Sequence, residues 1–183
     1  MDFETACRLV HVEQDHIVNA NGMVMTPGYV DIHSHGAWGS SFDDGEKGIT
    51  TARAGHMAHG TTRQVLSLIT NPIDVICGNL KTVHDMMPDR PDILGAHLEG
   101  PFLAMPRKGA HDPNCLVDPT PDLVSRMLDA ADGCLRQITI APELPHGIDA
   151  IRRFFLAEWF RRSATAMPTT RLPEKDSTPE PES

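Results

Sequence analysis

Short apolar segments alternate along this chain with longer segments that have a different spacing of apolar residues. The short segments are typical of strands and lie at 29–33, 63–70, 93–98 and 135–141. The longer segments have helical spacing or composition and lie at 48–58, 72–87, 121–131 and 148–160. Strands that alternate with helices predict parallel βαβ units, so we expect an α/β fold.

The two ends of the chain differ from this pattern. In residues 1–27, short apolar stretches at 10–12, 17–18 and 23–25 predict strands, and Asn21-Gly22 predicts a hairpin turn between the last two. Residues 163–183 are rich in Pro, Ser, Thr, Glu and Lys, which favours a disordered tail. We therefore expect three segments, with boundaries at 1–27, 28–160 and 161–183.

Composition limits the classes of partner. The 183 residues carry 16 Lys and Arg against 25 Asp and Glu, a formal net charge of −9. This balance argues against binding to nucleic acid or to an anionic membrane. No apolar run approaches the ~20 residues of a membrane span, and the acidic N-terminus is unlike a signal peptide. Four widely spaced cysteines are best explained as reduced thiols in a cytoplasmic protein.

The first candidate for chemistry is the pair His33 and His35. Side chains at positions i and i+2 of a strand point to the same face, and this pair lies where a predicted strand passes into a loop. Neutral imidazole is a common ligand of divalent metals. The pair is therefore either a metal site or two ordinary polar residues at the end of a strand.

The second candidate is Glu99, which ends an apolar strand and is followed at once by Gly100 and Pro101. A buried carboxylate needs a partner, and a metal ion is a good one. The alternative is a loop carboxylate that pairs with Arg107 or Lys108.

Two further loops carry weaker candidates. His111, in a tight loop, can donate a hydrogen bond to a substrate carbonyl or hydroxyl, although an exposed loop histidine is the simpler interpretation. Glu143 lies between two prolines that alone would make a rigid turn. His56 and His59 lie near the end of a helix, and we interpret both as structural.

Five segments in series resemble the amidohydrolase superfamily, and within it the N-acetylglucosamine-6-phosphate deacetylase family. They are 27–36 (PGYVDIHSHG), 59–62 (HGTT), 95–102 (GAHLEGPF), 108–113 (KGAHDP) and 141–145 (APELP). Their order and approximate spacing are similar to that family over residues 27–155. The His-x-His pair is shared by many amidohydrolases, whereas the later segments are far more specific.

The resemblance implies a metal-dependent hydrolase on a (β/α)₈ barrel, with a small β-sandwich of which residues 1–27 would be a remnant. It implies that Glu99 binds a catalytic divalent metal (Zn²⁺ or Fe²⁺), that His33 and His35 belong to a second metal position, and that Ala110 and His111 contact the sugar. The substrate would be the amino-sugar phosphate N-acetylglucosamine 6-phosphate, and the products glucosamine 6-phosphate and acetate.

The chain also departs from the family. Its last histidine is His146, so the family's later metal-ligand histidines and its catalytic Asp have no counterpart. A complete barrel typically needs ~250 residues, so we expect about four βα units, a partial (β/α)₈ barrel, that are inactive or incomplete alone. The alternatives are a non-catalytic fragment and an interaction module whose half-barrel pairs with a second half, for example as a homodimer.

Overall fold

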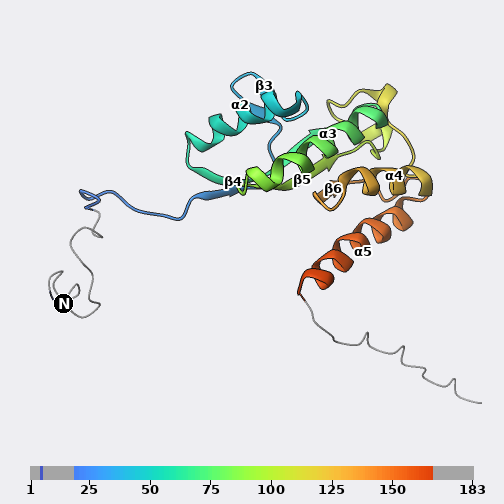
Figure 1. The fold of residues 1–183 in the computed structure, drawn as a ribbon. Helices are drawn as coiled ribbons and strands as arrows, with labels where there is room; N and C mark the ends of the chain where they lie inside the picture. The colour runs from blue at the N-terminus through green and yellow to red at the C-terminus, as the bar shows by residue number, and fades with distance from the viewer. Residues whose placement is uncertain (1–4, 6–18, 167–183) are drawn as a thin grey trace, which may run out of the picture.

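The computed structural model describes residue 5 and residues 19–166 of the chain. A four-stranded parallel sheet organises this part, in the order β1-β4-β5-β6 (Figure 1). The strands are β1 (Tyr29–Asp31), β4 (Thr61–Ile69), β5 (Ile93–Glu99) and β6 (Leu135–Thr139). The helices are α2 (Gly45–Met57), α3 (Ile73–Met86), α4 (Pro121–Ala131) and α5 (Gly147–Ala166). The sheet confirms the predicted α/β class and its four strand–helix units.

Short elements fill the connections. A two-stranded antiparallel hairpin, β2 (Gly36–Ala37) and β3 (Ser40–Ser41), follows β1. Gly36 has a φ of +152°, and a side chain there would meet the Ser40 carbonyl oxygen at 2.0 Å, so only glycine fits at this turn. Three 3₁₀ turns follow later elements, namely η2 (Met87–Asp89), η3 (Met105–Arg107) and η4 (Pro113–Cys115). The β2–β3 hairpin and the η3–η4 loop lie beside the exits of the strands.

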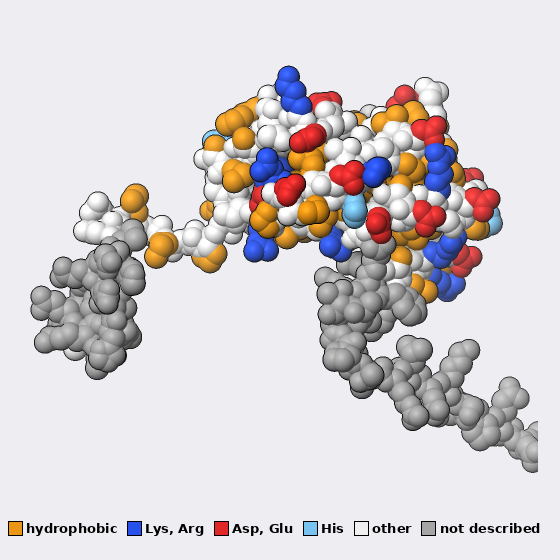
Figure 2. All heavy atoms as spheres, in the orientation of Figure 1, with side chains coloured by type: hydrophobic (Ala, Val, Ile, Leu, Met, Phe, Trp, Pro, Cys, Tyr) orange, Lys and Arg blue, Asp and Glu red, His pale blue; other side chains and the backbone are white. Residues whose placement is uncertain are grey.

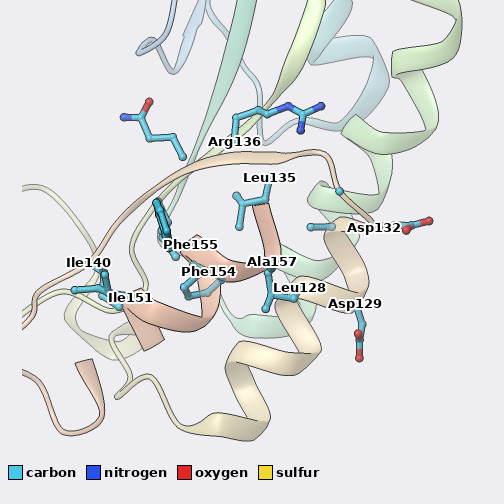
Figure 3. Close-up of a pocket in the computed structure, with 14 residues that line it drawn as sticks. Leu128, Asp129, Asp132, Leu135, Arg136, Ile140, Ile151, Phe154, Phe155 and Ala157 are labelled. Atoms are coloured by element: carbon cyan, nitrogen blue, oxygen red, sulfur yellow. The ribbon is translucent and has the colours of Figure 1, made fainter. Parts of the chain in front are cut away.

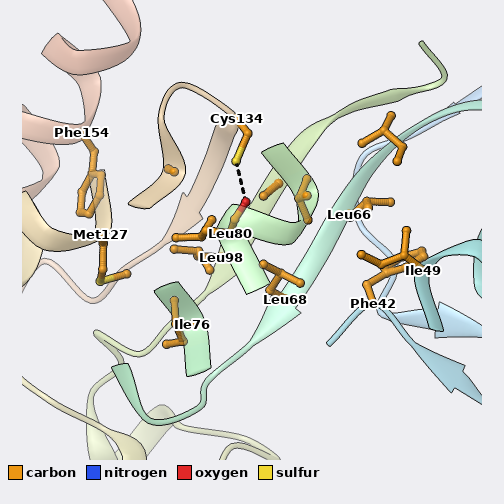
Figure 4. Close-up of a cluster of buried hydrophobic side chains, with 14 of the residues drawn as sticks. Phe42, Ile49, Leu66, Leu68, Ile76, Leu80, Leu98, Met127, Cys134 and Phe154 are labelled. Carbon is orange, nitrogen blue, oxygen red and sulfur yellow. Dashed lines mark hydrogen bonds between the residues drawn. The ribbon is translucent and has the colours of Figure 1, made fainter. Parts of the chain in front are cut away.

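The hydrophobic core lies between the sheet and its helices (Figure 4). Leu66 and Leu68 of β4 and Leu98 of β5 are fully buried there against Ile76 and Leu80 of α3. Because successive side chains of a strand point to opposite faces, the residues between them lie on the other face of the sheet. Each fully buried aliphatic side chain contributes roughly 1.5–3 kcal/mol by leaving water, so this packing fixes the sheet against the helices.

The prediction of a hairpin at Asn21-Gly22 is wrong, as far as the described residues show. Asn21 and Gly22 do form a turn, with φ values of +50° and +81°. Residues 23–25 that follow are not in a strand, and Val24 is 88% exposed. An extended segment becomes a strand only when another strand satisfies its backbone groups, and none does so among the described residues. The strands predicted at 10–12 and 17–18 lie outside the described residues.

At the other end, the backbone of α5 is helical to Ala166, past residue 160 where the tail was expected to begin. Residues 167–183 lie outside the described part. None of the described helices combines the length and apolar character needed to cross a bilayer. On the face drawn in Figure 2, acidic and basic side chains are interspersed and form no single-sign patch.

Candidate functional site

Two histidines and one carboxylate meet where β1 and β5 end. His35 Nε2 lies 2.9 Å from Glu99 Oε2, and His33 Nε2 lies 3.8 Å from Glu99 Oε1. One ligand atom from each of the three residues lies within 4.8 Å of the others. The exits of parallel strands lie at one edge of the sheet, and only β4 separates β1 from β5, which explains how residues 64 to 66 positions apart converge. The three residues are called the ligand triad below.

Local hydrogen bonds hold the loop that carries the two histidines. Asp31 Oδ1 accepts a bond from the His33 backbone N–H at 3.0 Å, and its other oxygen lies 3.6 Å from His56 Nδ1. His56 Nε2 lies 3.1 Å from the Gly36 carbonyl oxygen. Burial raises the pKa of Asp31, but hydrogen bonds from Ser34 and the His33 backbone, with the nearby His56, outweigh it and leave the pKa below its usual value. His56 thus has the structural role that its place near the helix end predicts.

His111 joins the triad from the loop between β5 and α4. Its Nε2 lies 3.6 Å from Glu99 Oε2, and its Nδ1 accepts a hydrogen bond from the Thr70 backbone N–H at 3.4 Å. Lys108 donates to the His111 carbonyl oxygen at 2.9 Å and does not pair with Glu99. The histidine is therefore held in the site and is not the exposed loop residue of the simpler interpretation.

The neighbouring sequence candidates lie outside the triad. Ala110 is exposed in the same loop as His111. Glu143 is exposed in the turn after β6 and is not part of the triad. The structure thus brings together His33, His35 and Glu99 with His111, and leaves Glu143 as a turn residue.

A fourth histidine, His97, lies beneath the triad. Its side chain is fully buried, with Nδ1 2.9 Å from Ser67 Oγ and Nε2 2.9 Å from Thr139 Oγ1. Burial, together with the nearby His33, lowers the pKa of His97 to about 4, so the ring is neutral near pH 7. Sequence reasoning placed His97 in a motif but gave it no role. The available signal was its position two residues before Glu99, on the same face of a strand.

Asp43 is a second residue that sequence reasoning missed. One oxygen accepts a hydrogen bond from the Ile69 backbone N–H at 3.2 Å, and the other accepts from the amides of Asn71 and Asn79 at 3.2 and 3.1 Å. Burial raises the pKa of Asp43 above its usual value, although these hydrogen bonds oppose the shift. The carboxylate ties the loop before α2 to the exit of β4, beside His35.

The triad has a suitable donor set for a divalent metal. Two imidazole nitrogens and a carboxylate oxygen are typical ligands of Zn²⁺, and imidazole also suits iron. The basic side chains that lie against the Glu99 carboxylate in the described part of the chain are three histidines, with no Lys or Arg. His35 Nδ1 is buried there without a hydrogen-bond partner. The three ligand atoms lie within 4.8 Å of one another, so small side-chain rotations can bring them to coordination distance of one ion. The residues therefore fit a metal.

An apolar groove of about 450 Å³ lies away from the triad (Figure 3). It runs between the outer strand β6, α4 and α5, and Leu135, Ile138, Phe154 and Phe155 are among its lining residues. None of the ligand triad borders it. The ligand triad and the apolar groove are therefore separate sites in the described part of the chain.

Comparisons with known proteins find deacetylase relatives, although no family model matches the chain. It is 27% identical over 150 residues to N-acetylglucosamine-6-phosphate deacetylase from Lysinibacillus sphaericus, covering 78% of this chain and 38% of the relative. It is 31% identical over 133 residues to the deacetylase of that name from Vibrio furnissii, covering 70% and 33%. The chain thus spans just over a third of the length of the curated relatives it matches.

Solved structures agree with the sequence relatives. A mutant N-acetyl-D-glucosamine-6-phosphate deacetylase from Mycobacterium smegmatis, in complex with N-acetyl-D-glucosamine-6-phosphate, superposes with a TM-score of 0.69 at 38% identity. The match covers 72% of this chain and 35% of that one. The enzyme from Pasteurella multocida gives a TM-score of 0.63 at 25% identity, with the same coverage. These matches confirm the resemblance and the parallel half-barrel as part of a (β/α)₈ barrel.

Proposed function

We propose that this chain, which is homologous to about a third of N-acetylglucosamine-6-phosphate deacetylase, forms the metal-binding part of a site for that reaction. The ligand triad would hold Zn²⁺ or Fe²⁺, and the reaction would convert N-acetylglucosamine 6-phosphate to glucosamine 6-phosphate and acetate. The observation that carries the proposal is the convergence of His33, His35 and Glu99 within 4.8 Å at the exits of two strands. A divalent metal bound there would polarise the acetamide carbonyl and lower the pKa of water.

His111 is the residue best placed to contact the substrate. Because its Nδ1 accepts the Thr70 backbone N–H, the neutral ring carries its proton on Nε2. That N–H faces Glu99 Oε2 at 3.6 Å, which is long for a hydrogen bond and leaves the donor able to bind another oxygen nearby. An acetamide or hydroxyl oxygen of the sugar is suitable. Ala110, exposed beside it, would line the same approach.

Hydrolysis also needs a group that moves protons. In the described site Glu99 is surrounded by histidines, and Asp43 is engaged by a backbone N–H and two amides. Neither carboxylate is available as general acid and base. We therefore propose that the chain alone binds metal and substrate, and that efficient turnover needs groups from another polypeptide segment.

Metal titration of the purified full chain tests the site. We expect Zn²⁺ binding at one site by calorimetry, lost in Glu99→Gln and kept in Glu46→Gln, an exposed control on α2. Equal affinity in both variants would refute the triad as the site. Acetate release from N-acetylglucosamine 6-phosphate, measured with and without Zn²⁺, is expected to stay at background. Turnover that Glu99→Gln abolishes would show that the chain is complete enough to catalyse.

The sheet edges favour a second candidate function, association with a second copy of the chain. Among the described residues β1 and β6 each pair on one side only. Exposed apolar side chains lie near both edges, including Val30 at 56% and Phe155 at 65%. Because the strands are parallel, β6 of one copy can pair with β1 of another.

Light scattering after size-exclusion chromatography tests this association. A dimer is expected for the wild type, and a monomer for Phe155→Ser. Met57→Ser, which removes an exposed apolar side chain at the end of α2, is expected to remain dimeric. A wild-type monomer at roughly 50 µM would contradict the second candidate, since a barrel-like interface should be stable at micromolar concentration.

A further inference from the structure

We propose that His97 is a positioning residue that sets the orientation of the His33 ring for metal binding. The inference rests on the proposed metal site, but it concerns a residue outside the ligand triad. Four observations carry it: the strand register, the anchoring of His97, the ring contact, and the few other contacts of His33.

Strand register places His97 directly below the ligands. His97 and Glu99 are two residues apart on β5, so both side chains point to the face opposite the helices. In the sheet, His97 pairs with Ser67 of β4, and Glu99 pairs with Thr139 of β6. The interior of the half-barrel therefore has an upper layer with Glu99 and a lower layer with His97.

His97 is held rigidly from two sides. Ser67 on β4 and Thr139 on β6 each lie 2.9 Å from one of its ring nitrogens. The ring is fully buried, so water cannot replace either partner. A rotation of the ring would break both hydrogen bonds at once. The imidazole is thus fixed by its two neighbouring strands.

The His33 ring, in contrast, has few contacts that orient it. Its side chain is 49% exposed, and its Nε2 is 3.8 Å from Glu99 Oε1, beyond hydrogen-bond distance. The ring centroid of His97 lies 4.8 Å from that of His33, with an interplanar angle of 86°. The corresponding contact with His35 is longer, at 5.4 Å and 71°. The closest ring contact of His33 is therefore with the anchored ring below it.

A structural role for His97 makes a different prediction from a positioning role. If the ring only joins three strands, its loss lowers the stability of the protein but leaves the metal affinity of the folded fraction unchanged. If it positions His33, metal affinity falls even in a variant that folds normally. Residues that orient metal ligands typically change affinity by about 10- to 100-fold.

The decisive variants change one hydroxyl on β6. Thr139→Val removes the hydrogen bond to His97 Nε2 and keeps the side-chain shape, whereas Thr139→Ser keeps the hydroxyl. Thr62→Val is the matched control, because the Thr62 hydroxyl donates to the Tyr29 carbonyl oxygen at 3.3 Å, away from the triad. We expect about 10-fold weaker Zn²⁺ binding by calorimetry for Thr139→Val, and wild-type affinity for Thr139→Ser and Thr62→Val. Wild-type affinity in a folded Thr139→Val would overturn the proposal.

Proton NMR of the metal-free chain tests the orientation without any metal. The wild type should show a nuclear Overhauser effect between ring protons of His33 and His97, and His97→Gln should shift the His33 ring resonances through loss of the ring current. Unchanged His33 resonances would refute the proposal. If this contact is present but the wild type binds no Zn²⁺, the proposed metal site fails while the orientation of His33 stands.

Discussion

Acidification should destabilise the metal-free protein through His97. The ring is fully buried between Ser67 and Thr139, and burial, with the nearby His33, lowers its pKa from 6.5 to about 4. Between these two values the unfolded chain holds a proton that the folded chain does not. The stability contributed by the neutral ring is therefore complete above about pH 6.5 and is lost as the pH falls toward 4. The full displacement corresponds to about 3 kcal/mol, at about 1.4 kcal/mol per pH unit.

Urea unfolding followed by circular dichroism measures this effect. The free energy of unfolding is determined near pH 7, pH 5.5 and pH 4 with a chelator present, for the wild type and for His97→Gln. His97→Gln should be less stable near pH 7, because burial of an amide leaves the hydroxyl partners imperfectly satisfied. Its further loss on acidification should be smaller than that of the wild type by about 3 kcal/mol. His59→Gln, at an exposed position, should follow the wild type.

Comparing how the free energy of unfolding changes with pH in the wild type and in His97→Gln separates the contribution of His97 from that of the other titrating groups. Carboxylates protonate in both proteins over the same range, so their contribution cancels in the difference between wild type and variant. Parallel pH profiles for the wild type and His97→Gln would refute the reasoning. They would mean that the ring gains its proton without loss of stability, so it would not be a buried neutral group.

Three further predictions concern the metal and the fold. Zn²⁺ at about 100 times its dissociation constant should stabilise the wild type by about 2.7 kcal/mol and raise the unfolding midpoint by roughly 5–10 °C in a thermal-shift assay. Glu99→Gln should lose this shift, and a shift of wild-type size would contradict the site. Leu80→Ala, in the core beneath the sheet, should lower the free energy of unfolding in urea by about 2.7–5 kcal/mol; a loss under about 1 kcal/mol would show that the core is loosely packed. Thr120→Ala removes the hydroxyl that accepts the Leu123 backbone N–H at the start of α4, and should cost about 1 kcal/mol by urea unfolding, while an unchanged midpoint would rule out this cap.

Most helices and strands could be predicted from the sequence, because their apolar spacing and their end signals lie within the element itself or next to it. Helix α4 has the predicted bounds, 121–131. Its apolar stripe recurs every three or four residues, Thr120 caps the start, and the end coincides with positive φ at Asp132 and Gly133. Each of these signals acts within a few residues, so the sequence contains them directly.

The hairpin at Asn21-Gly22 shows the limit of local signals. The turn forms with the backbone that this dipeptide favours, yet residues 23–25 are not in a strand. A turn depends on its own residues, whereas a strand depends on the backbone groups of another segment. Alternating apolar residues therefore predict a strand only on condition that a partner is present.

The same distinction separates the ligand triad from the ring below it. His33, His35 and Glu99 could be predicted because Glu99 ends β5, the two histidines lie in the loop directly after β1, and parallel strands bring their ends to one edge. The role of His97 depends on hydroxyls 30 and 42 residues away in the chain, and the sheet register alone brings them to the ring. Neither Ser67 nor Thr139 has a motif of its own.

The two polar layers also explain how a neutral lower ring suits a metal site above it. A cation held by Glu99 and the upper histidines would repel a protonated imidazole only one layer away. Two hydroxyls can each donate or accept, so they satisfy a neutral ring in either tautomer without adding charge. Lysine or arginine at position 97 would keep a polar interior but place a positive charge against the ligands. A rigid neutral ring at position 97 can therefore orient His33 and does not weaken the attraction between the Glu99 carboxylate and a metal cation.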